Sequence, residues 1–242
     1  MLKAENISFS YDRRPILGDV GIACARGSIT ALLGPSGSGK TTLLKCLALL
    51  EMPQKGRIVI DDIAYDFPQK TAEHWASPWP ALTVVFQQLF LWPHMTLREN
   101  ILLPVRKQAG ADAERRLSLL IETFDMKEFI DRHPNETSRG QQQRAALARA
   151  LLLQPRYILC DEITSALDVE QVGKVLECLK LVKGQGVGVL VITHQLSFAR
   201  KSADEIVFMD EGRIVEHGGA GILEKPQTER FARFLEMVEA TY

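Results

Sequence analysis

The stretch Gly34-Pro-Ser-Gly-Ser-Gly39-Lys40-Thr41-Thr42 decides the fold of this chain. The apolar residues 29–33 before it predict a buried strand, and residues 42–50 after it predict a helix with one apolar face. In such a strand–turn–helix unit, glycines let successive backbone N–H groups point inward, and the helix N-terminus adds a partial positive charge. The pattern predicts a phosphate cradle formed by Gly34, Pro35, Ser36, Gly37, Ser38, Gly39, Lys40, Thr41 and Thr42.

Two side chains of this turn suit the chemistry of a nucleoside triphosphate. Lys40 would reach the outer phosphates, and the Thr41 hydroxyl would be a ligand of a Mg²⁺ ion that bridges them. The competing interpretation is a glycine-rich turn with a chance lysine, which the flanking strand and helix both disfavour. The sequence therefore predicts a nucleotide-binding protein.

Composition excludes several classes of protein. The 242 residues are 46% hydrophobic and 24% charged, which is ordinary for a globular protein with a substantial core. A net charge of −1 argues against a dedicated nucleic-acid binder, and no basic block would anchor the chain to lipid. The N-terminus lacks the apolar stretch of a signal peptide, and the longest apolar runs are too short to span a membrane. We expect a cytoplasmic protein that reaches the membrane only through a partner.

The four cysteines support a reducing compartment. They lie far apart without metal-type spacing, so they are expected to be small buried residues: Cys24, Cys46, Cys160 and Cys178.

Strand and helix patterns alternate along most of the chain, with one interruption. Strands are predicted over 2–10 (at a sheet edge), 20–25, 28–33, 56–62, 83–86, 157–160 and 187–193, followed by a hairpin of 205–210 and 213–216. Further helices are predicted over 112–131, 141–153, 169–183, 195–202 and 229–240, and Thr96 with Glu99 predicts a capping box. Residues 65–82 predict a loop with at most one helical turn. Residues 92–136 contain only helix and loop, which predicts an inserted helical lobe.

Polar residues follow two of the predicted buried strands. Asp161 and Glu162 end one strand, and His194 ends another, at the strand ends where open α/β sheets bind ligands. Asp161 suits Mg²⁺, through water, and Glu162 suits polarising an attacking water. The alternative is a capping pair of acids, which the phosphate cradle upstream disfavours. His194 at this strand end either touches a γ-phosphate or merely fills the core.

Three further segments are candidates for function, and two of them keep a second interpretation. Tyr11, upstream of the cradle, either packs at a strand end or stacks on adenine. Ser138 to Gly140 opens a helix and is a second possible anion site, through its N–H groups and dipole. The apolar residues 89–95 are either a core loop or a docking surface for a partner helix.

Together these motifs resemble an ATP-binding cassette, the motor subunit of ABC transporters, over essentially the whole chain. Residues 34–42 match the phosphate loop, Gln87 the glutamine loop, residues 137–141 the signature, residues 157–162 the acidic strand, residues 165–168 the loop after it and His194 the switch histidine. The resemblance implies an α/β fold: a P-loop NTPase core with a mostly parallel central sheet, an N-terminal antiparallel β-subdomain and an inserted helical subdomain. A single domain of residues 1–242 would comprise a core of 1–91 and 154–242 and a helical part of about 92–153 that includes the signature helix.

The resemblance also implies how ATP would be hydrolysed. Two chains would sandwich two ATP molecules head to tail, with the signature of one chain acting in trans on the nucleotide of the other. The trans residues would be Ser138, Arg139, Gly140 and Gln141, and Asp168 would contact across the interface. In cis, Gln87 would touch Mg²⁺ and water, Glu162 would be the base, and His194 would hold the γ-phosphate. Tyr11 would stack on adenine with Ile16 beside it.

Partners follow from the same resemblance. They would be a second cassette, as homodimer or heterodimer, integral membrane permease subunits docking on the helical lobe and residues 88–98, and indirectly an extracytoplasmic solute-binding protein. The chain would be peripheral on the inner face of the cell membrane, without a nucleic-acid partner. Residues 86–88, 93–96, 140–144, 208–212 and 226–230 look like those of polar amino-acid importers.

Other classes share parts of this pattern. A cassette that regulates a membrane complex, of the cell-division or lipoprotein-release type, would have the same motor residues without importing a solute. A DNA-repair or translation cassette is disfavoured because the chain has no long coiled coil, second cassette or basic face. A kinase is disfavoured because it needs neither the signature nor Asp168.

The chain departs from the family pattern in three places. Thr137 and Arg139 stand where the signature usually has a leucine and its first glycine. Since backbone N–H groups bind the phosphate, Arg139 is tolerable if its φ is negative. Ile163 stands where a proline usually follows the acids, and residues 68–82, with His74, Trp75 and Trp79, have no clear match. We expect slow to normal ATPase activity.

Overall fold

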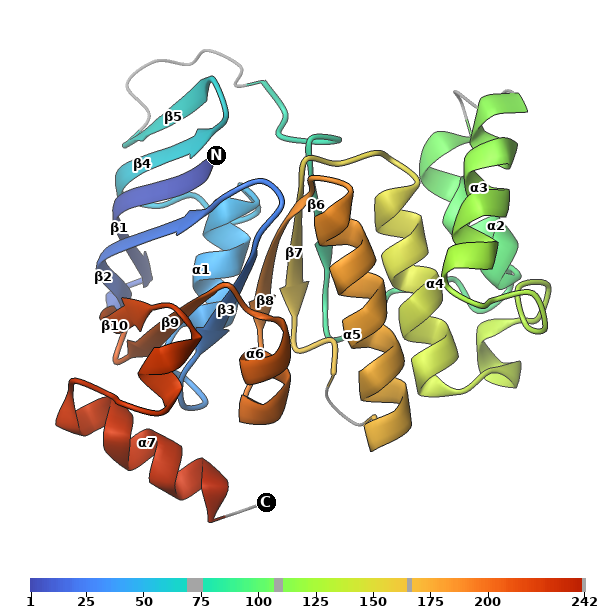
Figure 1. The fold of residues 1–242 in the computed structure, drawn as a ribbon. Coiled ribbons are helices and arrows are strands. Elements are labelled where there is room, and N and C mark those ends of the chain that lie inside the picture. The colour runs from blue at the N-terminus through green and yellow to red at the C-terminus, as the bar shows by residue number, and fades with distance from the viewer. Residues whose placement is uncertain (69–75, 107–110, 165–166, 241–242) are drawn as a thin grey trace.

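A mostly parallel six-stranded sheet runs through the middle of the molecule (Figure 1). The computed structural model describes residues 1–68, 76–106, 111–164 and 167–240. The strand order is β10-β9-β3-β8-β7-β6, and every neighbouring pair is parallel except β10 with β9. The bounds are β3 (Ile29–Leu33), β6 (Leu82–Val85), β7 (Tyr157–Asp161), β8 (Gly188–Ile192), β9 (Glu205–Asp210) and β10 (Arg213–Gly218). The residues of β3, β7 and β8 are all buried, as their continuous apolar runs predict.

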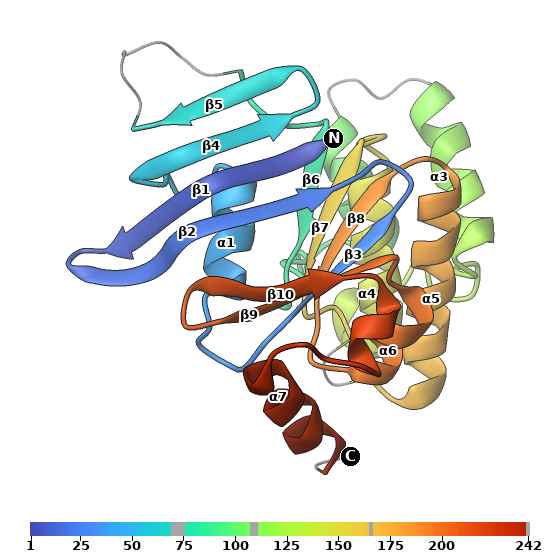
Figure 2. The same cartoon turned by 60° about the vertical axis from the view of Figure 1, so that its left-hand side comes forward.

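A second, four-stranded antiparallel sheet has the order β2-β1-β4-β5 (Figure 2). It contains β1 (Leu2–Tyr11), β2 (Arg14–Cys24), β4 (Lys55–Ile60) and β5 (Ile63–Phe67). The prediction that residues 2–10 lie at a sheet edge is wrong, because Leu2 pairs with Cys24 on one side and with Ile60 on the other. The predicted loop of residues 65–82 also starts too early. A turn at residues 61–62 leads into β5, which buries Tyr65 and Phe67.

The two sheets enclose α1 (Lys40–Leu47) between them (Figure 2). Its buried leucines pack in one apolar cluster with β1, β2 and β4 of the small sheet and with residues of the large one. All four cysteines are buried, as predicted, and burial raises their pKa values.

Helices cover the other face of the large sheet and form the predicted helical lobe. The lobe contains α2 (Leu97–Leu102), η1 (Leu103–Val105), α3 (Ala111–Thr123), η2 (Pro134–Glu136) and α4 (Arg139–Leu151). The remaining helices are α5 (Val169–Gly184), α6 (Leu196–Ser202), η3 (Ala220–Leu223) and α7 (Glu229–Glu239). The capping box of Thr96 and Glu99 is present at the start of α2. Among the described residues, no helix combines the length and the apolar character needed to cross a membrane.

One predicted helix is too long. Residues 112–131 were expected to be one helix, but α3 ends at Thr123 and Asp125 adopts a positive φ of 49°. The Arg144 guanidinium, from α4, donates hydrogen bonds to the carbonyls of Phe124 and Asp125 at 2.7 and 2.8 Å. These carbonyls therefore bind a side chain of α4 instead of continuing the helix.

Candidate nucleotide site

The phosphate loop connects β3 to α1, at the carboxyl end of the parallel sheet. A Cβ atom at Gly34 would lie 2.0 Å from the Met209 carbonyl oxygen, so this position requires glycine. Gly37 has a φ of +79° and has open space where a Cβ would be. The turn is thus packed from behind by β9 and open in front, and the first N–H groups of α1 have no acceptor within their own helix. This geometry fits the predicted phosphate cradle.

Lys40 lies inside this turn. Its ammonium donates hydrogen bonds to the carbonyls of Gly34 and Pro35 at 2.8 and 2.7 Å. Burial lowers the pKa of Lys40, while the carboxylates of Glu162, Asp161 and Asp210 act in the opposite direction. The charge of Lys40 therefore belongs to the same cluster as the predicted acids.

Thr41 and Asp161 meet across the sheet edge. Asp161 is the last residue of β7 and pairs with Ile192 of β8, so it reaches the same edge as the phosphate loop. The Thr41 hydroxyl donates to Asp161 Oδ1 at 3.2 Å. Burial raises the pKa of Asp161, although the Thr41 hydrogen bond and Lys40 counteract this. A hydroxyl and a buried carboxylate are the oxygen ligands that Mg²⁺ prefers, and the cation would favour the ionised carboxylate, so these residues fit the predicted metal.

Glu162 and His194 lie next to this pair. Glu162 adopts a φ of 48° and its N–H donates to the Ile192 carbonyl at 3.0 Å, which fixes the turn after β7. His194 Nδ1 lies 3.7 Å from Glu162 Oε1, and both side chains are partly exposed. Two threonines that sequence reasoning did not identify connect the turn after β7 with the turn after β8. The hydroxyls of Thr164 and Thr193 are 3.5 Å apart.

Tyr11 and Ile16 lie close to the end of the phosphate loop and the start of α1. Tyr11 is 42% exposed, its ring meets that of Phe9 edge-on, and its hydroxyl donates to Glu51 at 3.2 Å. Burial raises the pKa of Tyr11, Glu51 raises it further, and a hydrogen-bond interaction with Thr42 lowers it, which places Tyr11 beside the start of α1. The Ile16 carbonyl would be 3.2 Å from a Cβ at Gly39. Both predicted adenine neighbours therefore flank the loop.

The signature residues lie apart from this cluster, on the helical lobe. Ser138 is the N-cap of α4: its hydroxyl accepts from the Gln141 N–H at 3.3 Å, and its own N–H donates to Gln141 Oε1 at 2.9 Å. Arg139 is helical and its φ is negative, which is the condition under which an arginine is tolerated at this position of the signature. Among the described residues, none of 138–141 hydrogen-bonds to the phosphate loop.

Asp168 is connected to the signature through a residue that sequence reasoning missed. Asp168 is the N-cap of α5 and accepts hydrogen bonds from the N–H of Gln171 at 2.8 Å and from its side-chain amide at 2.9 Å. A Cβ at Gly140 would lie only 2.2 Å from Gln171 Oε1. The only signal in the sequence was the position of Gln171, three residues after a capping acid. Ser165 and Ala166, and likewise His74 and Trp75, fall outside the described residues.

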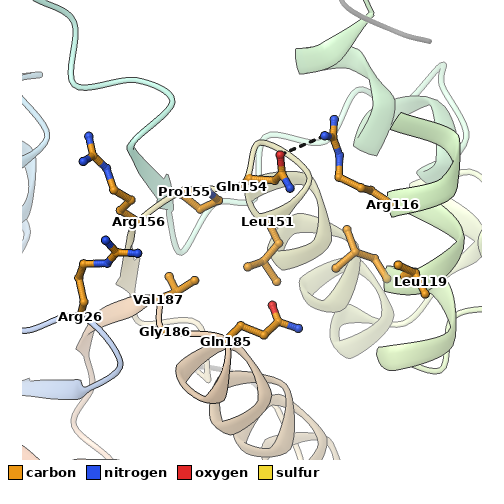
Figure 3. A pocket seen from close by; sticks show the side chains of 11 residues that line it. Arg26, Arg116, Leu119, Leu151, Gln154, Pro155, Arg156, Gln185, Gly186 and Val187 are labelled. Atoms are coloured by element: carbon orange, nitrogen blue, oxygen red, sulfur yellow. Dashed lines mark hydrogen bonds between the residues drawn. The ribbon is translucent and has the colours of Figure 1, made fainter. Parts of the chain in front are cut away.

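A different pocket, of about 370 Å³, lies at the opposite edge of the sheet (Figure 3). It is lined by Arg26, Arg116, Arg156, Leu151 and Val187 among others, beside the amino ends of β7 and β8. Arg116 donates there to Gln154 Oε1 at 3.0 Å. α/β sheets typically bind ligands at the carboxyl ends of their strands, and this pocket lies at the other end, away from the candidate nucleotide site.

Comparison with known proteins agrees with this geometry. A family sequence model described as "ABC transporter" matches residues 17–165, more than half of the chain. The "L-cystine import ATP-binding protein TcyC" of Bacillus subtilis is 39% identical over 243 residues, covering 98% of each chain. The "Arginine transport ATP-binding protein ArtP" of Haemophilus influenzae is 36% identical over 239 residues, covering 97% of this chain and 98% of the relative. The solved dimeric structure of the ATP-binding cassette MJ0796 in a post-hydrolysis state, bound to ADP and Pi, has a TM-score of 0.77 and 31% identity, covering 91% of this chain and 99% of that one.

Proposed function

Because this chain belongs to the ABC transporter family and is built as its ATPase subunit, we propose that it energises the import of a polar amino acid. One observation carries the ATPase function: Lys40, Thr41, Asp161, Glu162 and His194 converge at one edge of the parallel sheet. The relatives named for cystine and arginine transport support the amino-acid substrate, and they favour an importer over a cassette that only regulates a membrane complex.

Each residue of the site has a role in binding or hydrolysis. The N–H groups of residues 34–42 and the Lys40 ammonium would hold the phosphates of ATP, and the Tyr11 ring would stack on the adenine. Thr41, Asp161 and Gln87 would hold Mg²⁺, which neutralises charge on the phosphate oxygens when bound. Glu162 would accept a proton from the attacking water, and His194 would donate a hydrogen bond to the γ-phosphate.

The active form would be a dimer in which each nucleotide contacts both chains. Similarity to a dimeric cassette supports this arrangement. Ser138, Arg139, Gly140 and Gln141 of a second chain would face the phosphate loop, and Asp168 would lie at the contact. Because Arg139 is helical, the N–H groups of Arg139 and Gly140 at the start of α4 have no acceptor within the helix and would point at a phosphate, while the N–H of Gln141 is bound by the Ser138 hydroxyl.

An enzyme assay tests this proposal. Wild-type chain should hydrolyse ATP only when Mg²⁺ is present. Glu162→Gln should abolish turnover and accumulate a dimer with MgATP, measured by light scattering. The matched control is Glu177→Gln, which makes the same change at an exposed acid of α5 and should retain turnover and remain in the wild-type monomer–dimer equilibrium. If Glu162→Gln remains monomeric at high concentration with MgATP, the sandwich dimer is wrong.

A membrane permease would dock near the start of the helical lobe. Phe90 and Trp92 are 60% and 53% exposed, and a neighbouring cavity of about 430 Å³ is lined by Leu49, Leu50, Trp79, Phe86 and residues of α4. Exposed aromatic residues beside an apolar cavity suit a short helix of a partner. This location would place the chain on the inner face of the cell membrane.

Co-purification tests the partner. The tagged chain is expressed in its own host, the membranes are solubilised gently, and the proteins that remain bound are identified. A multi-span permease, with or without a solute-binding protein, is expected. A membrane protein with few spans and a large extracytoplasmic domain would instead support the regulatory alternative.

A further inference from the structure

The segment 87–92, which follows β6, is held by side chains of the helical lobe. The last sheet pair of β6 is Val85 with Cys160. Beyond it, the guanidinium of Arg139 donates to the Gln87 carbonyl. The guanidinium of Arg149 donates to the carbonyls of Leu89 and Phe90 at 2.6 and 2.9 Å. Both arginines belong to α4.

A third side chain fixes the end of the same segment. Asn100, which is fully buried in α2, accepts from the Trp92 N–H at 2.7 Å and donates to the Trp92 carbonyl at 3.1 Å. Four carbonyls of residues 87–92 thus accept hydrogen bonds from α2 or α4. We therefore expect the boundary between core and helical lobe to lie after Phe86, five residues before the boundary at 91/92 that the sequence predicts.

The two arginines hold the segment in different ways. Arg149 is half-buried, burial lowers its pKa, and no carboxylate among the described residues forms an ion pair with it. Withdrawing its two carbonyl acceptors would leave a poorly solvated charge, so this contact is a fixed one. Arg139, the first residue of α4, is exposed, and its one side-chain hydrogen bond to the described part of the chain goes to the Gln87 carbonyl. Its contact is therefore the one that can be removed without disturbing the core.

We propose that Arg139 is a positioning residue that fixes the Gln87 backbone to the signature end of α4, so that Gln87 and Ser138 move as one body. Phe90 and Trp92 project from the same segment and are exposed, so a permease pressing on them would displace both Gln87, at one nucleotide, and Ser138, at the partner's nucleotide. The coupling of Gln87 and Ser138 to a permease rests on the proposed function. The tether itself rests only on the contacts described above.

The first test measures the tether in the full chain without nucleotide, by hydrogen exchange of the backbone amides of residues 87–92. Arg139→Leu keeps the aliphatic stem and removes the donors, and it should speed exchange about threefold to tenfold, as expected for one exposed charge-assisted hydrogen bond. Arg139→Lys keeps a donor and should give an intermediate rate. Arg115→Leu, at an exposed arginine of α3, is the matched control and should leave the rate unchanged. Equal exchange in wild type and Arg139→Leu would overturn the proposal.

The second test measures the consequence for ATP hydrolysis. Arg139→Leu should lower kcat about threefold to tenfold while the KM for MgATP changes less than about twofold, because the phosphate loop is untouched. Arg139→Lys should recover at least half of the lost kcat, and Arg115→Leu should match wild type. An unchanged kcat, or a rise in KM that accounts for the whole effect, would contradict the positioning role. If wild type itself does not hydrolyse ATP, the proposed function fails, and the exchange measurement still decides the tether.

Discussion

Replacing Gly140 by alanine should destabilise the chain, and removing the Gln171 side chain as well should reverse the sign of that effect. A Cβ at Gly140 would lie 2.2 Å from Gln171 Oε1 and 2.7 Å from its Cδ, so the amide must move. Moving it breaks the 2.9 Å hydrogen bond from Gln171 to Asp168. The substitution therefore tests whether the signature and Asp168 are connected through Gln171.

The expected magnitude follows from three contributions to the free energy of unfolding. Losing the hydrogen bond to Asp168 costs about 1 kcal/mol. Crowding the start of α4 costs about 1–3 kcal/mol, partly relieved by movement of the flexible glutamine. Alanine stabilises the helix by up to about 1 kcal/mol, because glycine is the poorer helix former. The net result for Gly140→Ala is a destabilisation of about 1–2 kcal/mol. In a Gln171→Ala background the first two contributions are absent, and the same substitution should stabilise by about 0.5–1 kcal/mol.

Thermal unfolding of the four nucleotide-free proteins measures this double-mutant cycle. For a chain of this length, Gly140→Ala should lower the Tm by roughly 2–6 °C in the wild-type background and raise it by roughly 1–3 °C in the Gln171→Ala background. Gly173→Ala is the matched control, since a Cβ at this glycine of α5 would meet nothing within 4 Å, and it should raise the Tm in both backgrounds. Equal Tm shifts for Gly140→Ala in the two backgrounds would refute the connection through Gln171.

Three further predictions concern other parts of the chain. Tyr11→Ala should raise the KM for ATP about tenfold, whereas Tyr11→Trp keeps an aromatic face and should stay near wild type; equal KM values would remove Tyr11 from the adenine site. Burial raises the pKa of Glu216, but hydrogen bonds from Thr228 and from the amides of residues 227 and 228 outweigh it and hold that pKa below the ordinary 4.5. The stability that Glu216 contributes is therefore present above pH 4.5 and lost as the pH falls below it. Glu216→Gln should lower the free energy of unfolding by about 2 kcal/mol at pH 7, measured with denaturant, and by progressively less in acid. A difference that does not change with pH would contradict this. The double variant Phe90→Ser, Trp92→Ser should abolish co-purification of the permease. Leu119→Ser, at a similarly exposed leucine of α3, should not. If the double variant still binds the permease, the docking site lies elsewhere.

The convergence of the candidate nucleotide-site residues was predictable from sequence because each motif is local. A glycine-rich turn between a strand and a helix needs only a dozen neighbouring residues to be recognised, and buried strands that end in Asp161, Glu162 or His194 deliver those residues to one sheet edge. The rule that parallel strands share a carboxyl edge then brings the separate motifs together. The 3.2 Å contact of Thr41 with Asp161 spans 120 residues of sequence, and the shared carboxyl edge explains why the two residues meet, although the direct hydrogen bond was not predicted.

The parts that sequence reasoning missed depend on contacts between distant backbone and side chains. Arg144 binds the carbonyls that end α3 early, and Arg139 binds the Gln87 carbonyl. Backbone acceptors carry no residue-type signal, so neither contact is visible in the sequence pattern. Strand β5 was missed for a different reason: its five residues directly precede the Pro- and Trp-rich stretch, whose composition predicts a loop.

The contacts of Ser138 bear on how the proposed dimer would close. In the single chain its hydroxyl oxygen accepts the Gln141 N–H, so the residue already has a structural role as N-cap of α4. A serine hydroxyl has one donor and two acceptor positions, and capping uses one acceptor only. Its O–H therefore remains able to donate to a γ-phosphate oxygen of a second chain's nucleotide, while the helix start supplies further N–H groups. Closure would thus need no rearrangement at Ser138, and the residue that would have to hold its position is Gln141, whose amide oxygen accepts the Ser138 N–H.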